Sequence, residues 1–314
     1  MDMLSPRWMR LGMLALVAAA IATGTSGTRA LAQGLFARRE QVIYEGNPVN
    51  QATIRLGNWG SGTCKESTQN TYSGSRSIEI TPRGLFAGGR IDFANPVDLT
   101  NSFNNPDAYL QFVTRFRGVQ SEYDDWAVGL GGPGATDMYA GVPRTARPVR
   151  RIRVMLEFEG GPAVERQVDV SAFRLSDDGW MNVSLPLAVF KSELSLPEYE
   201  LKRLVITGDG MDPFHIGEIR TIRDTTPLQA NAGQDKEVAR NYLIGFQGVC
   251  ESGATAVKYS WDFDQSDGIQ EQAVGDLVYH RFSKAGNFTV TLTVSDLFGL
   301  KQPATSTIKV KVNE

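Results

Sequence analysis

Residues 259–264 read Tyr-Ser-Trp-Asp-Phe-Asp, and residues 279–296 read YHRFSKAGNFTVTLTVSD. In the first stretch three aromatic residues alternate with serine and aspartate, and in the second Val290, Leu292 and Val294 alternate with threonine. A repeat of two residues is the period of a β-strand, which places alternate side chains on opposite faces. Both stretches therefore predict strands with one apolar face toward a core and one polar face toward water.

The same alternation returns at the end of the chain. Ile308, Val310 and Val312 alternate there with Lys309 and Lys311. Outward lysines are one device that protects an edge strand from pairing with another chain. We therefore expect this last strand to lie at the edge of its sheet.

Three segments of the C-terminal region, in order along the chain, resemble the signatures of the PKD (polycystic kidney disease) domain. They are residues 227–235 (PLQANAGQD), 259–264 and 279–296. The resemblance implies an immunoglobulin-like β-sandwich over residues 226–314. The alternation breaks just before it, at residues 223–227 (RDTTP), which is the expected domain boundary.

The region before this boundary is also expected to be β-structure throughout. Its apolar stretches alternate with period two and end at Gly, Pro, Asn or Asp, and no stretch of three turns has helical spacing. The chain is therefore expected to be all-β. The clear strands are expected at residues 109–117, 151–159, 167–173, 180–185, 203–207 and 214–222, with a short helical turn at 187–191.

Residues 36–223 resemble a galactose-binding-like jelly roll of the kind found in carbohydrate-binding modules. The resemblance is carried by four short segments in order, 42–45 (VIYE), 72–80 (YSGSRSIEI), 179–190 (GWMNVSLPLAVF) and 214–220 (FHIGEIR). It implies a jelly-roll β-sandwich in front of the immunoglobulin-like one. It also implies that the first domain recognises carbohydrate.

The charge balance and the scarcity of cysteine exclude several classes of protein. Lys and Arg total 32 against 35 Asp and Glu, a formal net charge of −3, so the chain lacks the basic surface that nucleic-acid binding requires. Two cysteines are too few for a disulfide-knit miniprotein or a Cys-rich zinc module. Cys64 and Cys250 fall in different predicted domains, so no bridge between them is expected. Cys250 is expected to be a small buried residue, and Cys64 a free thiol in a polar loop.

The N-terminus has the three parts of a secretory signal peptide. Arg7 and Arg10 precede an apolar run at residues 11–22, and Ala-Leu-Ala at residues 30–32 forms the cleavage site. The apolar run is shorter than the ~20 residues that cross a bilayer as a helix. Residues 1–32 are therefore expected to be a signal peptide, and the mature chain to be secreted without a membrane span.

No catalytic motif is evident, and the chain is not expected to be an enzyme. A serine or cysteine nucleophile needs a base, usually histidine, and no GxSxG motif occurs. His280 lies at a position that PKD domains often fill with His or a small polar residue, and His215 lies inside an expected strand, so both are expected to pack structurally. The Asp pairs at 124–125 and 177–178 are expected to form turns, although two acids across a cleft are all that a glycoside hydrolase needs.

The prediction of a metal site rests on the jelly-roll resemblance alone. Modules of that kind frequently hold a structural calcium ion with carboxylates from the first and last strands, which implies Glu45 and Glu218 as ligands here. Gly217 stands where the closing strand of the family usually has its acid. The run at residues 262–268 does not have the spacing of an EF-hand loop, because no Glu stands at its twelfth position.

Aromatic residues in polar, glycine-rich segments are the candidate ligand-binding residues. They are Trp59, Tyr123, Trp126 and Tyr139, with Asp125 beside them. Sugar rings stack their C–H faces on aromatic rings, and neighbouring carboxylates bond the hydroxyl groups. The alternative is that Trp126 closes one end of the sandwich.

Three functions stay open from the sequence. The first is a secreted, non-catalytic protein that recognises a polysaccharide or surface glycan through the jelly roll, with the PKD domain as a spacer or adhesion module. The second is a structural component of the cell surface or extracellular matrix that contacts other cell-surface proteins. The third is a hydrolase whose catalytic residues the sequence does not reveal. The apparent lack of a catalytic constellation favours the first two.

The signal peptide gives the first testable prediction. We expect the exported protein to begin at Gln33, because cleavage follows the Ala-Leu-Ala site at residues 30–32. Intact-mass spectrometry of the culture supernatant measures this directly. A mature chain that still carries Met1, or protein confined to the cytoplasm, contradicts the prediction.

Overall fold

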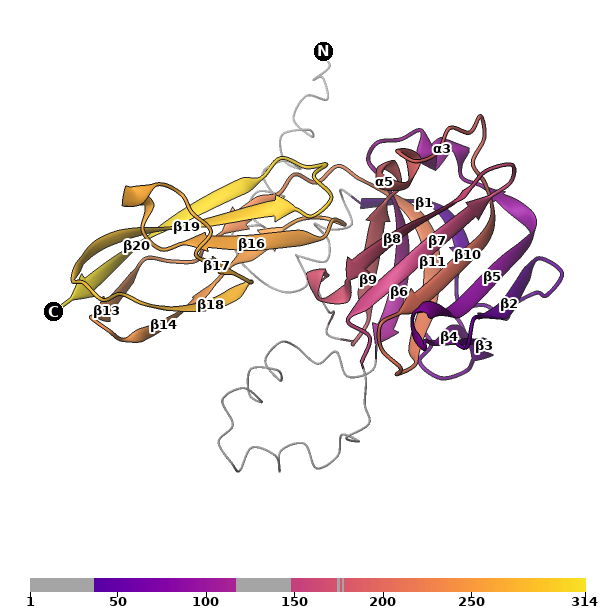
Figure 1. Cartoon of the computed structure of the whole chain (residues 1–314), viewed down its shortest axis with the longest axis horizontal. Coiled ribbons are helices and arrows are strands. Elements are labelled where there is room, and N and C mark those ends of the chain that lie inside the picture. The colour runs from indigo at the N-terminus through magenta and orange to yellow at the C-terminus, as the bar shows by residue number, and fades with distance from the viewer. Residues whose placement is uncertain (1–36, 117–147, 174–175, 177) are drawn as a thin grey trace, which may run out of the picture.

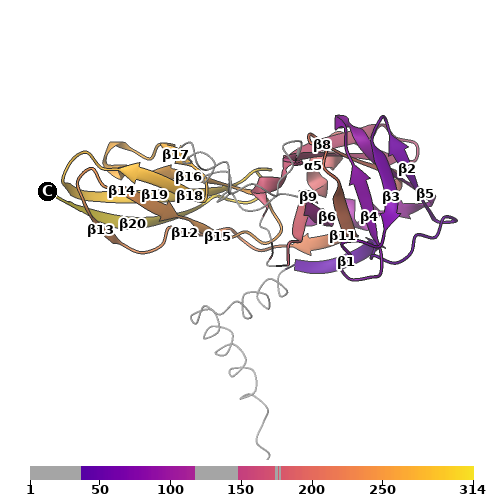
Figure 2. The same cartoon turned by 90° about the horizontal axis from the view of Figure 1, so that it is seen from below.

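The computed structural model describes residues 37–116, 148–173, 176 and 178–314. These residues fold into two β-sandwiches that lie end to end, as Figure 1 and the perpendicular view in Figure 2 show. Each sandwich has its own cluster of buried apolar side chains. The predicted all-β fold class is confirmed. The helical elements of the described residues are α3 (Thr100–Phe103), α5 (Leu187–Lys191) and the 3-10 turns η2 (Val170–Ala172) and η3 (Gln265–Asp267).

One layer of the first sandwich is a six-stranded antiparallel sheet, here called sheet A. Its order is β3-β4-β11-β6-β9, and β1 also pairs with β11. β11 is the central strand, because β4 pairs with its first residues and β1 with its last. The strands are β1 (Ala37–Tyr44), β3 (Thr63–Ser67), β4 (Ser77–Thr81), β6 (Ala108–Phe116), β9 (Met181–Pro186) and β11 (Phe214–Asp224).

The other layer is a five-stranded antiparallel sheet, here called sheet B, with the order β2-β5-β10-β7-β8. Its inner face packs on sheet A around aliphatic and aromatic side chains such as Phe112, Leu156 and Ile216, which are fully buried. Period-two alternation explains this core, because each strand sends every second residue inward. The strands are β2 (Ile54–Trp59), β5 (Gly84–Asp98), β7 (Arg151–Phe158), β8 (Ala163–Asp169) and β10 (Glu200–Gly208).

The second sandwich follows β11 directly. Its larger sheet has the order β13-β20-β19-β16-β17, and two pairs, β12-β15 and β14-β18, complete it. The strands are β12 (Gln229–Asn231), β13 (Lys236–Ala239), β14 (Leu243–Gln247), β15 (Val249–Glu251), β16 (Val257–Asp262), β17 (Ala273–Val274), β18 (Leu277–Arg281), β19 (Gly286–Asp296) and β20 (Ala304–Asn313).

The inward faces of this domain are those that the alternation predicted. Trp261 is 0% exposed, and Val290, Leu292 and Val294 are buried with it. The indole Nε1 of Trp261 donates a hydrogen bond to the carbonyl oxygen of Gly275 at 2.9 Å, which satisfies its polar atom inside the core.

The expectation of an edge position for the last strand is wrong. β20 lies between β19 and β13, and β13 pairs with it in parallel, with Lys236 opposite Val310. The lysines at 309 and 311 do face water. They are therefore the polar side of an interior strand that is exposed on one face, which has the same sequence pattern as a protected edge.

Two shorter elements predicted in the first domain had different outcomes. The helical turn at 187–191 is α5. The expected strand at 167–173 ends at Asp169 and continues as the turn η2.

Cys64 lies buried in β3 rather than in a polar loop, and burial raises the pKa of its thiol to about 12. Both Cys64 and Cys250 are free thiols, and Cys250 is half-buried.

The burial of Trp261 gives the second prediction. Trp261→Ala should lower the free energy of unfolding by about 3–5 kcal/mol, because it removes a large side chain from a packed core. The matched control is Tyr242→Ala, at a ring in the same domain that is 65% exposed, which should change stability by less than ~0.5 kcal/mol. Urea unfolding of both variants measures the difference. Equal small losses would show that Trp261 is not a core residue.

Candidate functional site

The outer face of sheet B, the side turned away from the core, carries the candidate site. Ile54 and Leu56 of β2 pack toward the core, so Arg55, Gly57 and Trp59 point outward. The position of Gly57 agrees with this, because a Cβ atom there would lie 2.8 Å from the guanidinium Nη2 of Arg90 on β5. A glycine at 57 thus leaves room for Arg90 to lie flat on the sheet.

Charged side chains of opposite sign alternate across this face. Arg203 on β10 lies between Asp92 on β5 and Glu157 on β7 in the strand register. Its Nε donates to Asp92 Oδ1 at 2.5 Å and its Nη1 to Glu157 Oε2 at 2.8 Å. Arg90 Nε lies 2.8 Å from the other carboxylate oxygen of Asp92. The hydrogen bond to Asp92 raises the pKa of Arg203 above its usual value. The pairs hold these side chains in one arrangement on the sheet.

An exposed aromatic ring lies beside this lattice. Phe86 of β5 is 72% exposed, and the guanidinium carbon of Arg153 lies 5.2 Å from its ring centroid. Arg153 itself is only 9% exposed and forms an ion pair with Glu165 of β8. One face of the phenyl ring therefore contacts a cation and the remainder of the ring is open to water.

Trp59 is the one predicted ligand-binding residue that the structure describes. It ends β2, is half-buried and pairs in register with Gly88, two residues along β5 from Phe86. The other four, Tyr123, Asp125, Trp126 and Tyr139, lie outside the described residues. Their role as ligand-binding residues stays a prediction.

Phe86 was not found by the sequence analysis. It stands in the segment Gly84-Leu85-Phe86-Ala87-Gly88-Gly89, where the alternation is interrupted. β5 has a register shift there relative to β10, between the pairs Thr207/Gly88 and Gly208/Gly84. The single available signal was an aromatic residue in a glycine-rich strand, the same signal that selected Trp59.

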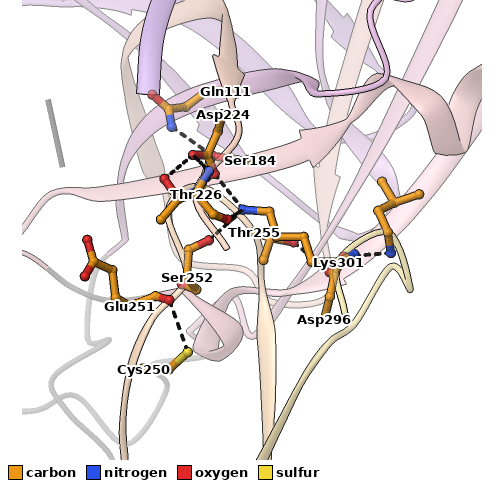
Figure 3. Close-up of polar contacts among 12 residues, drawn as sticks. Gln111, Ser184, Asp224, Thr226, Cys250, Glu251, Ser252, Thr255, Asp296 and Lys301 are labelled. Carbon is orange, nitrogen blue, oxygen red and sulfur yellow. Dashed lines mark hydrogen bonds and ion pairs between the residues drawn. The ribbon is translucent and has the colours of Figure 1, made fainter. Parts of the chain in front are cut away.

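The outer face of sheet A is instead filled by its own side chains. Gln111 Nε2 donates to Ser184 Oγ at 2.8 Å (Figure 3), and Gln111 Oε1 accepts from Arg220 Nε at 2.8 Å. Arg220 Nη1 in turn donates to Glu218 Oε2 at 2.8 Å, and Arg39 of β1 pairs with the other oxygen of Glu218. This row satisfies its own polar groups and leaves little free for a ligand.

Glu45 and Glu218 are the calcium ligands that the jelly-roll resemblance predicted. Both carboxylate oxygens of the buried Glu218 lie against guanidinium groups. Glu45 is exposed, and its Oε1 accepts a hydrogen bond from Asn47 Nδ2 at 2.7 Å. Within the described residues, no group of three or more His, Cys, Asp or Glu side chains is placed to hold a metal ion. The residues present do not fit a calcium ion at Glu218, because the ion would have to replace two positive groups.

The packing of aromatic side chains explains why position 217 is a glycine. Tyr72 and Trp180 form a tilted ring pair, with centroids 5.3 Å apart, that covers this point of β11. A Cβ atom at 217 would lie 3.0 Å from the Trp180 ring and closer still to Tyr72. The close approach of two aromatic side chains therefore excludes an acid at this position.

Both histidines are packed side chains. His215 Nδ1 lies 3.2 Å from Ser77 Oγ inside the first domain, and burial lowers the pKa of His215. The ring of His280 stacks on Phe263 with centroids 3.9 Å apart, and burial lowers its pKa as well. Ser77 and His215 resemble a nucleophile and base by type, but both are buried, so a substrate cannot reach them.

Comparison with known proteins identifies the class of the second sandwich. Residues 224–312 match the family described as PKD domain, so the C-terminal domain is an immunoglobulin-like PKD domain, as its three signatures predicted. No curated protein matches the chain. Among the described residues, no helix has the length and apolar character to cross a membrane.

Two solved structures show only distant similarity. A nucleoside hydrolase-related protein from Saccharophagus degradans, described as associated with carbohydrate metabolism, is 12% identical over 29% of this chain, with a TM-score of 0.24. The match spans 26% of that protein's own length. Fibronectin(III)-like modules of CbhA from Clostridium thermocellum are 9% identical over 55% of this chain and 82% of theirs, with a TM-score of 0.24. At these scores neither similarity bears on fold or function.

The pairing of Glu218 gives the third prediction. Glu218→Ala should lower the free energy of unfolding by about 3 kcal/mol, because it leaves Arg220 partly buried without its carboxylate partner. Glu45→Ala, at an exposed carboxylate, is the matched control and should be close to neutral. Chemical unfolding of both variants tests this. A neutral Glu218→Ala would show that the ion pairs do not hold sheet A together.

Proposed function

We propose that this chain is a secreted, non-catalytic binding protein that recognises a polysaccharide or surface glycan through the outer face of sheet B. The PKD domain acts beside it as a spacer or adhesion module, in keeping with the typically extracellular setting of PKD domains. The observation that carries the proposal is the exposed ring of Phe86 supported by Arg153, near Trp59 on the same face. The signal peptide expected at residues 1–32 supports the extracellular location.

The chemistry of this face suits a sugar. A pyranose ring has C–H faces that stack on aromatic rings and a rim of hydroxyl groups that donate and accept hydrogen bonds. Asp92 and Glu157 supply acceptors next to the arginine donors Arg90 and Arg203. Because ion pairs already order these four side chains, a ligand loses less conformational entropy in fixing them.

The non-catalytic part of the proposal is supported by the packed histidines. General acid or base catalysis requires a titratable group that touches the substrate. His215 is buried against Ser77 in the first domain, and the half-buried His280 stacks on Phe263 in the second. The two carboxylates on the proposed face, Asp92 and Glu157, are paired with arginines, so binding without turnover is the simplest function for this aromatic and charged surface.

A second candidate function is a structural role through protein contacts. One observation favours it: Tyr242, Leu243 and Tyr279 are exposed together at the β14-β18 pair of the PKD domain. A Cβ atom at Gly245 would lie 3.2 Å from the Tyr279 ring, so the ring lies over this glycine. Such a patch suits contact with another protein surface.

The fourth prediction distinguishes glycan binding from a structural role through protein contacts. In affinity electrophoresis against a panel of soluble polysaccharides, Phe86→Ala and Trp59→Ala should each weaken binding by roughly tenfold, because each removes one stacking ring. The melting temperature of Phe86→Ala should change by only a few degrees, since Phe86 is largely exposed.

The matched control is Tyr242→Ala, which removes an exposed ring from the other domain and should leave affinity unchanged. Weakened binding in this control alone would move the glycan site to the PKD domain. No affinity of the unaltered protein for any polysaccharide would favour the structural role.

A further inference from the structure

The junction of the two domains contains an ammonium group with every donor used. Lys301 lies in the loop between β19 and β20 of the PKD domain. Its Nζ donates to Asp224 Oδ2 at 2.8 Å, to the carbonyl oxygen of Thr226 at 2.7 Å and to that of Ser252 at 2.9 Å (Figure 3). A lysine has three N–H donors, so this site saturates them.

Asp224 is the matching acceptor at the end of the first domain. It is the last residue of β11, and its side chain is 0% exposed. Oδ1 accepts from Thr226 N at 3.0 Å and Thr226 Oγ1 at 2.6 Å, and Oδ2 accepts from Ala254 N at 2.7 Å as well as from Lys301. Burial alone would raise the pKa of Asp224, but these hydrogen bonds outweigh it and lower the pKa. The carboxylate therefore joins β11, the linker and two segments of the PKD domain.

The loop that carries Lys301 is itself held in place. Asp296 at the end of β19 accepts hydrogen bonds from the backbone N–H groups of Phe298 at 3.0 Å, Leu300 at 2.8 Å and Lys301 at 3.0 Å. It also accepts from Thr255 Oγ1 at 2.7 Å. The backbone of Lys301 is thus positioned before its side chain reaches the first domain.

Apolar contacts surround this polar network. Ala256 is fully buried within the hydrophobic cluster of the first domain, and Phe298 packs against the same cluster, although both belong to the PKD domain. The Lys301 ammonium lies 5.9 Å from the ring centroid of Tyr109 on β6. The core of one sandwich therefore extends into the other.

A glycine makes the close approach feasible. Gly253 has φ +63, and a Cβ atom there would lie 2.2 Å from Asp224 Oδ2. Any other residue would push the carboxylate away from Ala254 and Lys301. A substitution at Gly253, which carries no charge itself, should therefore disturb the charged groups of the junction.

From this geometry we infer that the PKD domain is a rigid extension of the first domain, locked in one orientation by Lys301 and Asp224. A buried ion pair adds little net stability, but any other arrangement would leave its charges without partners, so it selects one orientation. Domains joined by a linker ordinarily move relative to each other unless their interface opposes it. The inference does not depend on glycan binding. It gives the outer face of sheet B a fixed direction relative to the far end of the PKD domain.

The fifth prediction tests the lock by NMR residual dipolar couplings on the full exported chain. In the unaltered protein both domains should report the same alignment tensor. Lys301→Met, which keeps the side-chain length and removes the charge, should yield two different tensors. Gly253→Ala should do the same by displacing the Asp224 carboxylate. Lys309→Met, at an exposed lysine of β20, is the matched control and should keep one tensor.

Each outcome decides the inference. Two tensors in the unaltered protein would overturn it, and a single tensor in both Lys301→Met and Gly253→Ala would show that another contact fixes the orientation. Amide dispersion in the same spectra reports whether each domain of a variant is folded. If one variant unfolds, the other variant and the unaltered protein still test the lock.

Discussion

The carboxylate of Asp224 accepts four hydrogen bonds at the point where the first sandwich ends and the second begins. Two come from the linker, one from the loop before β16 and one from the ammonium of Lys301. A buried charge is tolerated only with such partners, so the linker, the two loops and β11 have to meet in one arrangement. This requirement and the apolar contacts of Ala256 and Phe298 with the first domain together set the relative placement of the two domains.

The two outer faces of the first sandwich differ in how their charged side chains are paired and exposed. On sheet A the residues Glu218, Gln111 and Ser184 are buried, and the partly buried Arg220 links them by hydrogen bonds. On sheet B the ion pairs around Arg203 are partly exposed to water, and an exposed aromatic ring lies beside them. Among the described residues, the outer face of sheet B combines fixed polar groups with the most exposed aromatic ring, Phe86, which is the combination a sugar ligand requires.

Residue types in the sequence predicted only part of the candidate site. Trp59 was selected because an aromatic residue among glycines and polar residues suits ligand contact, and the structure places it on an outer face. Phe86 follows from the same reasoning but was hidden by the register shift of β5. The roles of Glu218 and Gly217 depend on Arg39, Trp180 and Tyr72, which are distant in sequence, so a local pattern does not reveal them.

The sequence by itself determined the all-β class, the PKD domain and the buried faces of its strands, because the pleat of a strand imposes a period of two on neighbouring residues and that period is legible locally. The tertiary structure alone decided which strands lie at an edge, which carboxylates meet arginines and how the domains join. β20 has the pattern of an edge and lies inside its sheet because the short β13 pairs with it. Lys301 looks like any loop lysine until Asp224, 77 positions away, supplies its partner. Such pairings join residues far apart in the chain, and no local period encodes them.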